Sequence, residues 1–177
     1  MATLSCPVPS NINPLSPNGF KFAISKLPEV NFFCQSVNIP GILLGAPEFA
    51  TPFSLAPLPG DTLTYDTLEV QFIVDEGMVN YQVIYNWIVA LGFPNDYSQY
   101  TTFINNDQRN IVGELAKNFS DGTLQILNSS NNPVKTISFV DLFPISIASL
   151  TFQSTNDGVN YLIGNASFKF GYYKFLD

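Results

Sequence analysis

The chain has 177 residues, of which 46% are hydrophobic, so it is long enough for one domain with a sizeable core. Charged residues make up only 12%, against about a quarter in an ordinary soluble domain. This favours an assembly subunit covered by neighbours, although a polar uncharged surface would also suit a monomer. The net charge of −7 and the scattered bases argue against sequence-specific nucleic-acid binding, and the lack of histidine excludes the usual zinc sites and Ser-His or Cys-His catalysis.

No secretory signal stands at the N-terminus, and no apolar run is long enough to span a membrane, so we expect no membrane contact. The two cysteines, Cys6 and Cys34, form no C-x-x-C pair. One disulfide is compatible with the sequence, and two free thiols in a reducing compartment are the simpler interpretation.

Residues 1–19 are rich in proline and predict an extended N-terminal arm that becomes ordered against a partner. We expect Pro7, Pro9 and Pro14 of this arm to contact neighbouring subunits. Residues 20–177 then form a single domain.

Two strands are predicted directly after the arm. Residues 20–26, FKFAISK, alternate cleanly and place Phe20, Phe22 and Ile24 on one face. Residues 30–38, VNFFCQSVN, predict the second strand, which Pro40 and Gly41 end.

The next segment contains several prolines. Residues 42–53 predict a loose extended piece typical of an edge strand or a loop, and residues 55–61, LAPLPGD, a turn region. Residues 67–75, TLEVQFIVD, alternate again and predict a half-buried strand.

From about residue 78 the apolar period changes to that of a helix. Asp75 or Asn80 is a plausible N-cap, and Gly92 followed by Pro94 marks the end. We expect one apolar seam of this helix to face the sheet, formed by Val79, Val83, Trp87 and Leu91.

Residues 94–121 are polar and predict a long loop, in which residues 111–119 form a short helix or an irregular strand. A loop of this length is usually functional or covered by a partner. Tyr97 and Tyr100 are therefore our candidates for contacts between subunits.

The rest of the chain predicts strands over 122–127, 134–142, 148–154 and 161–175, with breaks at Phe143-Pro144 and at the turn Asn156-Asp157-Gly158. The sequence thus predicts a mainly β fold, an antiparallel β-sandwich or barrel of about seven strands with one amphipathic α-helix packed on it.

Five acids cluster in the sequence between residues 59 and 89. Each has an adequate structural role as turn former, solvated side chain or cap, so we expect no catalytic or metal site from Asp61, Asp66, Glu69, Asp75 and Glu76. No phosphate-binding glycine motif occurs either, and we expect neither enzymatic activity nor a cofactor.

The order of these elements resembles the tail tube proteins of contractile-tailed bacteriophages and their relatives at the tube ends and in the baseplate. The resemblance is carried in turn by FKFAISKLPEVNFFCQSVNIPG, by Pro59-Gly60-Asp61 with residues 67–75, by the helix with Trp87, by ISFVDLFPISIASLTFQ and by NASFKFGYYKF. It covers most of residues 20–175. The proline-rich arm and the loop 94–121 depart from a plain tube subunit, which leaves tube, tube terminator and baseplate subunit as alternatives.

The resemblance implies a structural virion protein, assembled in the host cytoplasm, that pairs with itself in a ring, commonly a hexamer. Its other partners would be tail tube, sheath, baseplate or terminator proteins, and DNA would pass through the ring as non-specific cargo. The net charge of −7 suggests an acidic lumen that repels phosphates. The alternative function is a carbohydrate-binding or lytic β-sandwich module, which would show acids or exposed aromatics converging in a cleft.

Overall fold

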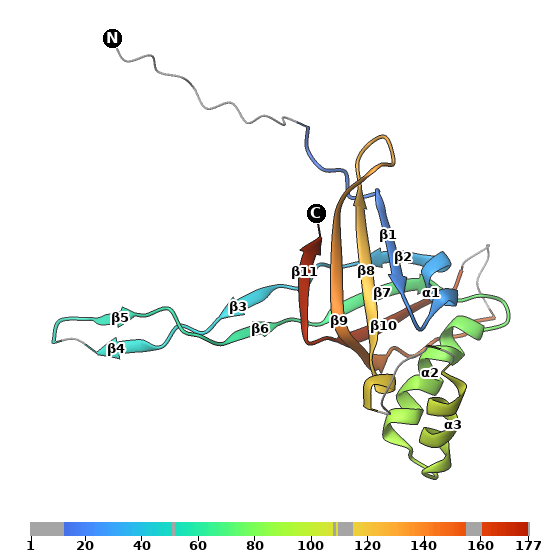
Figure 1. Cartoon of the computed structure of the whole chain (residues 1–177). Coiled ribbons are helices and arrows are strands. Elements are labelled where there is room, and N and C mark those ends of the chain that lie inside the picture. The colour runs from blue at the N-terminus through green and yellow to red at the C-terminus, as the bar shows by residue number, and fades with distance from the viewer. Residues whose placement is uncertain (1–12, 51, 108, 110–114, 155–160, 177) are drawn as a thin grey trace.

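The structure, a computed structural model, describes residues 13–50, 52–107, 109, 115–154 and 161–176 (Figure 1). The chain is mainly β, as predicted, and every strand pairing is antiparallel. The elements are β1 (Phe20–Ile24), α1 (Pro28–Phe33), β2 (Cys34–Val37), β3 (Ile42–Leu44), β4 (Glu48–Ala50), β5 (Leu55–Pro57), β6 (Leu63–Tyr65), β7 (Leu68–Ile73), α2 (Val79–Gly92), α3 (Ser98–Asn106), the 3-10 turn η1 (Leu115–Asn118), β8 (Ser120–Leu127), β9 (Pro133–Ile147), β10 (Ile163–Lys169) and β11 (Tyr172–Leu176).

Seven strands form the body as two sheets that share β9. We call β1-β8-β9-β11 sheet A and β9-β10-β7-β2 sheet B. The first part of β9 pairs with β8 and β11, whereas its last residues, from Phe143 to Ile147, pair with β10. The strand changes sheets just after Asp141, whose φ of 57° is one of the few positive values at a non-glycine residue.

Pro144 lies inside β9, although the sequence predicted a break there. It stands opposite Phe168, next to a register shift in β10. Beyond the crossing, β9 pairs only with β10 among the described strands, so it is an edge of sheet B. Proline is tolerated on an edge because its missing N–H can face the unpaired side.

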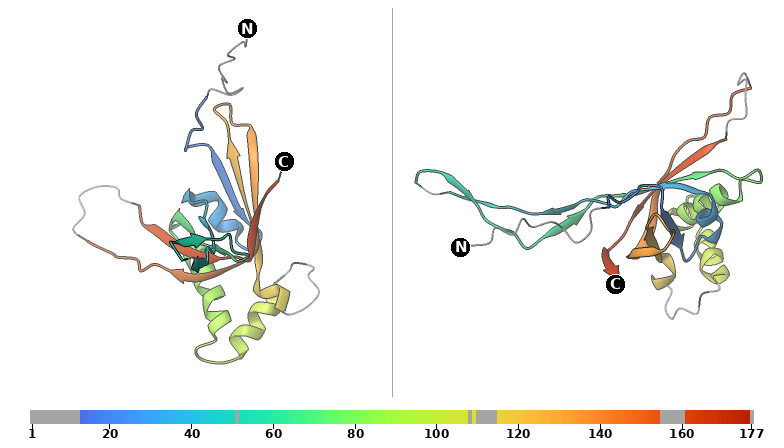
Figure 2. Two further views of the ribbon diagram at one scale, coloured as in Figure 1. Left: turned by 90° about the vertical axis from the view of Figure 1, so that its left-hand side faces the viewer. Right: turned by 90° about the horizontal axis from the view of Figure 1, so that it is seen from above.

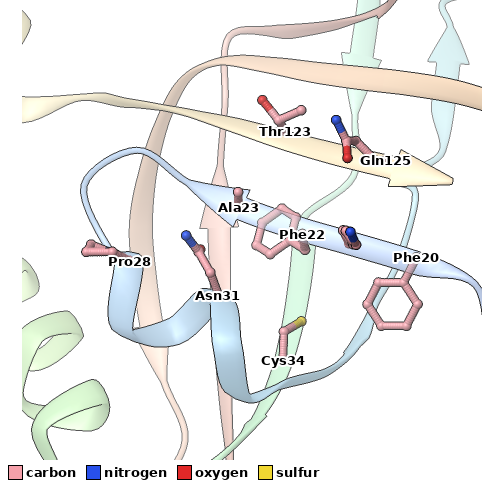
Figure 3. A pocket seen from close by; sticks show the side chains of 9 residues that line it. Phe20, Phe22, Ala23, Pro28, Asn31, Cys34, Thr123 and Gln125 are labelled. Atoms are coloured by element: carbon pink, nitrogen blue, oxygen red, sulfur yellow. The ribbon is translucent and has the colours of Figure 1, made fainter. Parts of the chain in front are cut away.

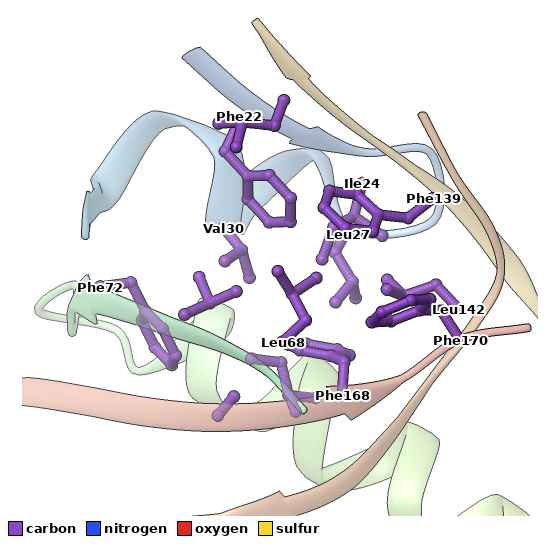
Figure 4. Close-up of a cluster of buried hydrophobic side chains, with 14 of the residues drawn as sticks. Phe22, Ile24, Leu27, Val30, Leu68, Phe72, Phe139, Leu142, Phe168 and Phe170 are labelled. Carbon is purple, nitrogen blue, oxygen red and sulfur yellow. The ribbon is translucent and has the colours of Figure 1, made fainter. Parts of the chain in front are cut away.

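The core lies between the two sheets (Figure 4). The predicted alternation of the first strand is confirmed, with Phe22 and Ile24 buried and Phe20 partly buried against the core. Gly164 is required by close packing, because a Cβ there would lie 2.7 Å from Cζ of the buried Phe72 ring.

A helix replaces the first half of the strand predicted over 30–38. Pro28 stands in the first turn of α1, where its fixed φ suits a helix and its missing N–H is no loss. Val30 is fully buried beneath β1 and β7, so tertiary packing overrides the β propensity of VNFF. Only Cys34–Val37 remains as strand.

Residues 42–65 form a two-stranded arm rather than the predicted loose edge piece and turn. β3 pairs with β6, and β4 pairs with β5 farther out. Figures 1 and 2 show this arm extending well away from the body. We call residues 42–65 the ribbon arm.

The helix α2 is confirmed, but its buried seam differs from the predicted one. Trp87 is only 1% exposed, and Val83 and Leu91 pack partly buried against the core. Val79 is 46% exposed, so its assignment to the seam is wrong. It is the first residue of the helix, and the buried residue of that turn is Asn80, held by hydrogen bonds.

The loop predicted over 94–121 contains the helix α3, which packs on α2. Its nine residues include few apolar side chains, and only Ile104 is buried, so the helical period is too weak to read from the sequence. The 3-10 turn η1 falls in the stretch where a short helix was one of the alternatives.

The C-terminal part differs in two places. Residues 148–153 are irregular rather than a strand, and the predicted long strand 161–175 is divided into β10 and β11 at Phe170 and Gly171. This division lets β10 pair in sheet B and β11 in sheet A. The turn predicted at 156–158 lies outside the described residues.

Candidate assembly surfaces

The five clustered acids do not converge. Asp61, Asp66 and Glu69 are exposed along the ribbon arm and β7, whereas Asp75 and Glu76 precede α2. Asp75 has a structural role, because its carboxylate accepts a hydrogen bond from the backbone N–H of Asn80 at 3.2 Å, while the Asn80 side-chain amide donates to the Ile73 carbonyl at 2.8 Å. This pair fixes the start of α2. Within the described ranges, no three Cys, Asp or Glu side chains gather in a group that could hold a metal ion.

Sheet A has two free edges at opposite ends. Among the described strands, β1 pairs only with β8, and β11 pairs only with β9. Each edge therefore presents unpaired backbone N–H and C=O groups, which readily pair with another chain. Neither β1 nor β11 contains a proline or an inward-pointing charge that would block such pairing.

A pocket of about 640 Å³ lies beside β1 (Figure 3). Its wall on the core side is formed by Phe20, Phe22, Pro28, Asn31 and Cys34, from β1, α1 and β2. Burial raises the pKa of the Cys34 thiol to about 11, and no disulfide links it to a described residue. The pocket is thus an apolar space along the free edge of sheet A. Cys6 lies outside the described residues.

The opposite edge carries the matching side chains. On β11, Phe175 is 57% exposed, and Tyr172 and Leu176 are also exposed. Phe175 stands opposite Ile137 of β9, in the same cross-strand row as Leu124 and Phe22. It therefore points to the core side of sheet A, where the Tyr173 ring at a centroid distance of 6.0 Å leaves more than half of it exposed. The sequence shows its alternation, but not that the strand is an edge.

The ribbon arm exposes apolar side chains along its whole length. Phe53 is 100% exposed, and the others are Ile42, Leu43, Leu44, Phe49, Leu55, Leu58 and Leu63. Contiguous apolar surface of this kind marks an interaction site. No lysine or arginine occurs between Lys26 and Arg109, so the arm is acidic as well as apolar.

The predicted contact residues are placed as follows. Tyr97 is exposed and Tyr100 partly exposed, and both pack with Phe93 in an aromatic cluster at the α2–α3 connection. Pro14 is exposed, whereas Pro7 and Pro9 lie outside the described residues.

A buried charge cluster, which the sequence analysis missed, joins α3 to the sheets. The Asp107 carboxylate is only 3% exposed and contacts Arg109 at 2.7 Å and Lys26 at 3.4 Å. The Lys26 ammonium donates to the Lys117 carbonyl at 2.5 Å and lies 3.8 Å from the Phe103 ring centroid. The neighbouring Arg109 guanidinium holds the pKa of Asp107 well below its usual range. Lys26 is about 80 residues away in sequence from Asp107 and Arg109, so only the fold reveals that the three charges meet.

No helix in the described part of the chain has the length and apolar character needed to cross a membrane.

Comparison with known proteins gives a consistent picture. No protein-family model matches the chain. The tail tube terminator protein of Enterobacteria phage T4 is 32% identical over 144 residues, which span 79% of this chain and 74% of the phage protein.

Solved structures of contractile injection systems share the fold. A chain in the cryo-EM structure of the sheath/tube terminator of the extracellular contractile injection system PVC superimposes with a TM-score of 0.58 and 16% identity, covering 93% of this chain and 98% of that chain. A chain of the tube-terminating cap of the anti-feeding prophage gives a TM-score of 0.56 and 14% identity over 99% of both chains.

Proposed function

Because the chain belongs to the family of the tail tube terminator protein of Enterobacteria phage T4, we propose that it forms a ring at the end of a contractile tail tube. The ring encloses a passage for DNA and contacts tube and sheath or baseplate proteins, and it assembles in the host cytoplasm before it becomes part of the virion. The role is structural, without catalysis.

The two complementary edges of sheet A carry this proposal. The strands β1, β8, β9 and β11 alternate in direction. A β11 strand laid against β1 of the next subunit therefore continues the antiparallel order. The contact joins different surfaces of the two subunits, so it repeats head to tail and closes into a ring where the rotation allows. Sheet A of every subunit then becomes part of one continuous barrel.

The side chains fit the same arrangement. Phe175 shares the core-side row with Phe22, so in a paired neighbour it faces the pocket beside β1. The pocket wall is largely apolar and includes Cys34. Burial of one phenylalanine side chain is worth about 1.5–3 kcal/mol. A closed ring also removes both edges from solvent.

The ribbon arm and the aromatic cluster around Tyr97 and Tyr100 supply further contacts. The arm extends away from the body (Figure 2). We assign it to adjacent subunits or to the next protein along the tail, together with the N-terminal arm of residues 1–19. Six subunits per ring remain our expectation.

A cysteine cross-link tests the edge contact. In a Cys6→Ser background, Phe175→Cys should form a disulfide with Cys34 of the neighbouring subunit under a mild oxidant at slightly alkaline pH. Non-reducing gels should then show a ladder of covalent multimers that collapses on reduction.

Phe152→Cys in the same background is the matched control, since Phe152 is exposed and lines a different pocket, with Ile73 and Tyr161. A chain that sediments only as a monomer would refute the ring. Rings whose Phe175→Cys variant cross-links no better than the control would refute the β1–β11 pairing.

A further inference from the structure

The face of sheet A that points away from the core has a composition unlike that of the whole chain. Two cross-strand rows define it, one running through Lys21, Gln125, Thr136 and Leu176 and the other through Ala23, Thr123, Ser138 and Lys174, with Asp121, Val140 and Tyr172 beside them. Among the described residues, the face carries two bases, Lys21 and Lys174, and two acids, Asp121 and Asp141, so its formal charge is zero whereas the whole chain carries −7. The acidic character of the protein is therefore segregated elsewhere.

Most of the polar side chains on this face can donate hydrogen bonds. Lys21 and Lys174 are both exposed, and hydroxyl and amide groups of Thr123, Ser138 and Gln125 lie between them. Lysine, threonine, serine and glutamine are the side chains that contact phosphate oxygens in protein–DNA complexes without reading sequence. Two acids, Asp121 and Asp141, lie together at the end of the face near the crossing of β9.

From this arrangement we infer that the outward face of sheet A is a phosphate-contacting surface for DNA, held by Lys21 and Lys174. The inference rests on the proposed function, in which sheet A lines the passage. It replaces the expected acidic, purely repelling lumen. Two lysines per subunit, repeated around a ring, give a sparse set of contacts that is independent of base sequence and weakens with salt.

The test uses the full chain in its assembled form. Rings are first scored by sedimentation, and binding of a short fluorescein-labelled duplex is then followed by anisotropy at several salt concentrations. The double variant Lys21→Gln/Lys174→Gln should bind more weakly and should flatten the dependence of log K on log salt concentration by about 1 or more. Lys135→Gln is the matched control, because Lys135 shares a row with Ile126 on the other side of the sheet; it should leave the slope unchanged.

Acetylation of lysines, read by mass spectrometry, provides the second readout. DNA should protect Lys21 and Lys174 from acetylation more than Lys135. An unchanged salt slope together with unchanged acetylation would overturn the inference. It would also be overturned if poly-glutamate displaced the labelled duplex as effectively as unlabelled DNA does. If the chain stays monomeric, the ring proposal fails, while the acetylation experiment on the monomer still decides the role of this face.

Discussion

At the scale of single residues, Trp87 joins the helical layer to the body. Its indole ring is buried beside the core, stacks near Phe103 of α3 at a centroid distance of 6.4 Å, and donates from Nε1 to the Asn118 carbonyl at 3.1 Å. The indole therefore contacts α3 and η1 as well as the core. The sequence correctly predicted its burial from the helical period, but not these polar and aromatic partners, which come from a segment that looked like a loop.

Replacing Trp87 should destabilise the fold severely. Trp87→Ala leaves a cavity and an unpaired carbonyl, and we expect a loss of about 3–5 kcal/mol in the free energy of unfolding. Urea denaturation measures it. Tyr85→Ala, at an exposed position of the same helix, should cost less than about 0.5 kcal/mol. Equal losses in the two variants would contradict the assignment.

Lys26 should give the protein an unusual pH dependence. Burial lowers the pKa of Lys26 to about 8 from its ordinary 10.5, against the opposing pull of the Asp107 carboxylate. The folded protein therefore loses this proton first, and the unfolded chain binds more protons between these two values. The free energy of unfolding that Lys26 contributes must then rise with pH across the same window.

The comparison is between the wild type and Lys26→Met. Their free energies of unfolding, measured by urea denaturation from about pH 8 to about pH 10.5, should shift relative to each other in favour of the wild type as pH rises. A constant difference, or a shift in the opposite direction, would show that Lys26 is not desolvated in the folded protein.

At the scale of elements, the sequence predicted those whose buried face is formed within one chain. β1 and β7 alternate because one face of each packs on the core, and α2 has a helical period for the same reason. α1 and α3 are too short to show a period, and α1 contains residues typical of strands.

The ribbon arm was missed for a different reason. Its residues are nearly all exposed, so no alternation between buried and solvated faces marks its strands. If a neighbouring subunit covers the arm, its apolar side chains are buried in the assembly but exposed in the single chain.

Shortening the ribbon arm should separate folding from assembly. Residues 45–62 can be replaced by Asn-Gly, which joins Leu44 to Leu63 in a two-residue hairpin and keeps the pairing of Ile42 with Tyr65. Because none of the described residues in this segment belongs to the buried core, thermal stability should change little, while rings or tubes should no longer form. Calorimetry and sedimentation of the same sample give both quantities. A large loss of stability would mean that the arm belongs to the fold.

At the scale of the whole molecule, the order of motifs along the chain was the most informative feature of the sequence, since it indicated the family that the relative from phage T4 confirms. Net charge was less informative. A value of −7 describes the chain but not its faces, because nine acids and no base stand between Lys26 and Arg109, in the part of the chain that holds α1, the ribbon arm, β7 and the helices α2 and α3. The strand register decides on which face each charged side chain lies, and the register cannot be derived from the composition.

The two free edges of sheet A also have a kinetic consequence. In a head-to-tail ring, the first subunits to associate form one interface each, but the last one enters between two neighbours and forms two interfaces for a single loss of translational freedom. Its second contact is effectively intramolecular, at an effective concentration in the millimolar range or above. Incomplete rings should therefore be scarce at equilibrium, and a solution of this protein should hold mainly free chains and closed rings, with the proportion between them changing steeply with total concentration.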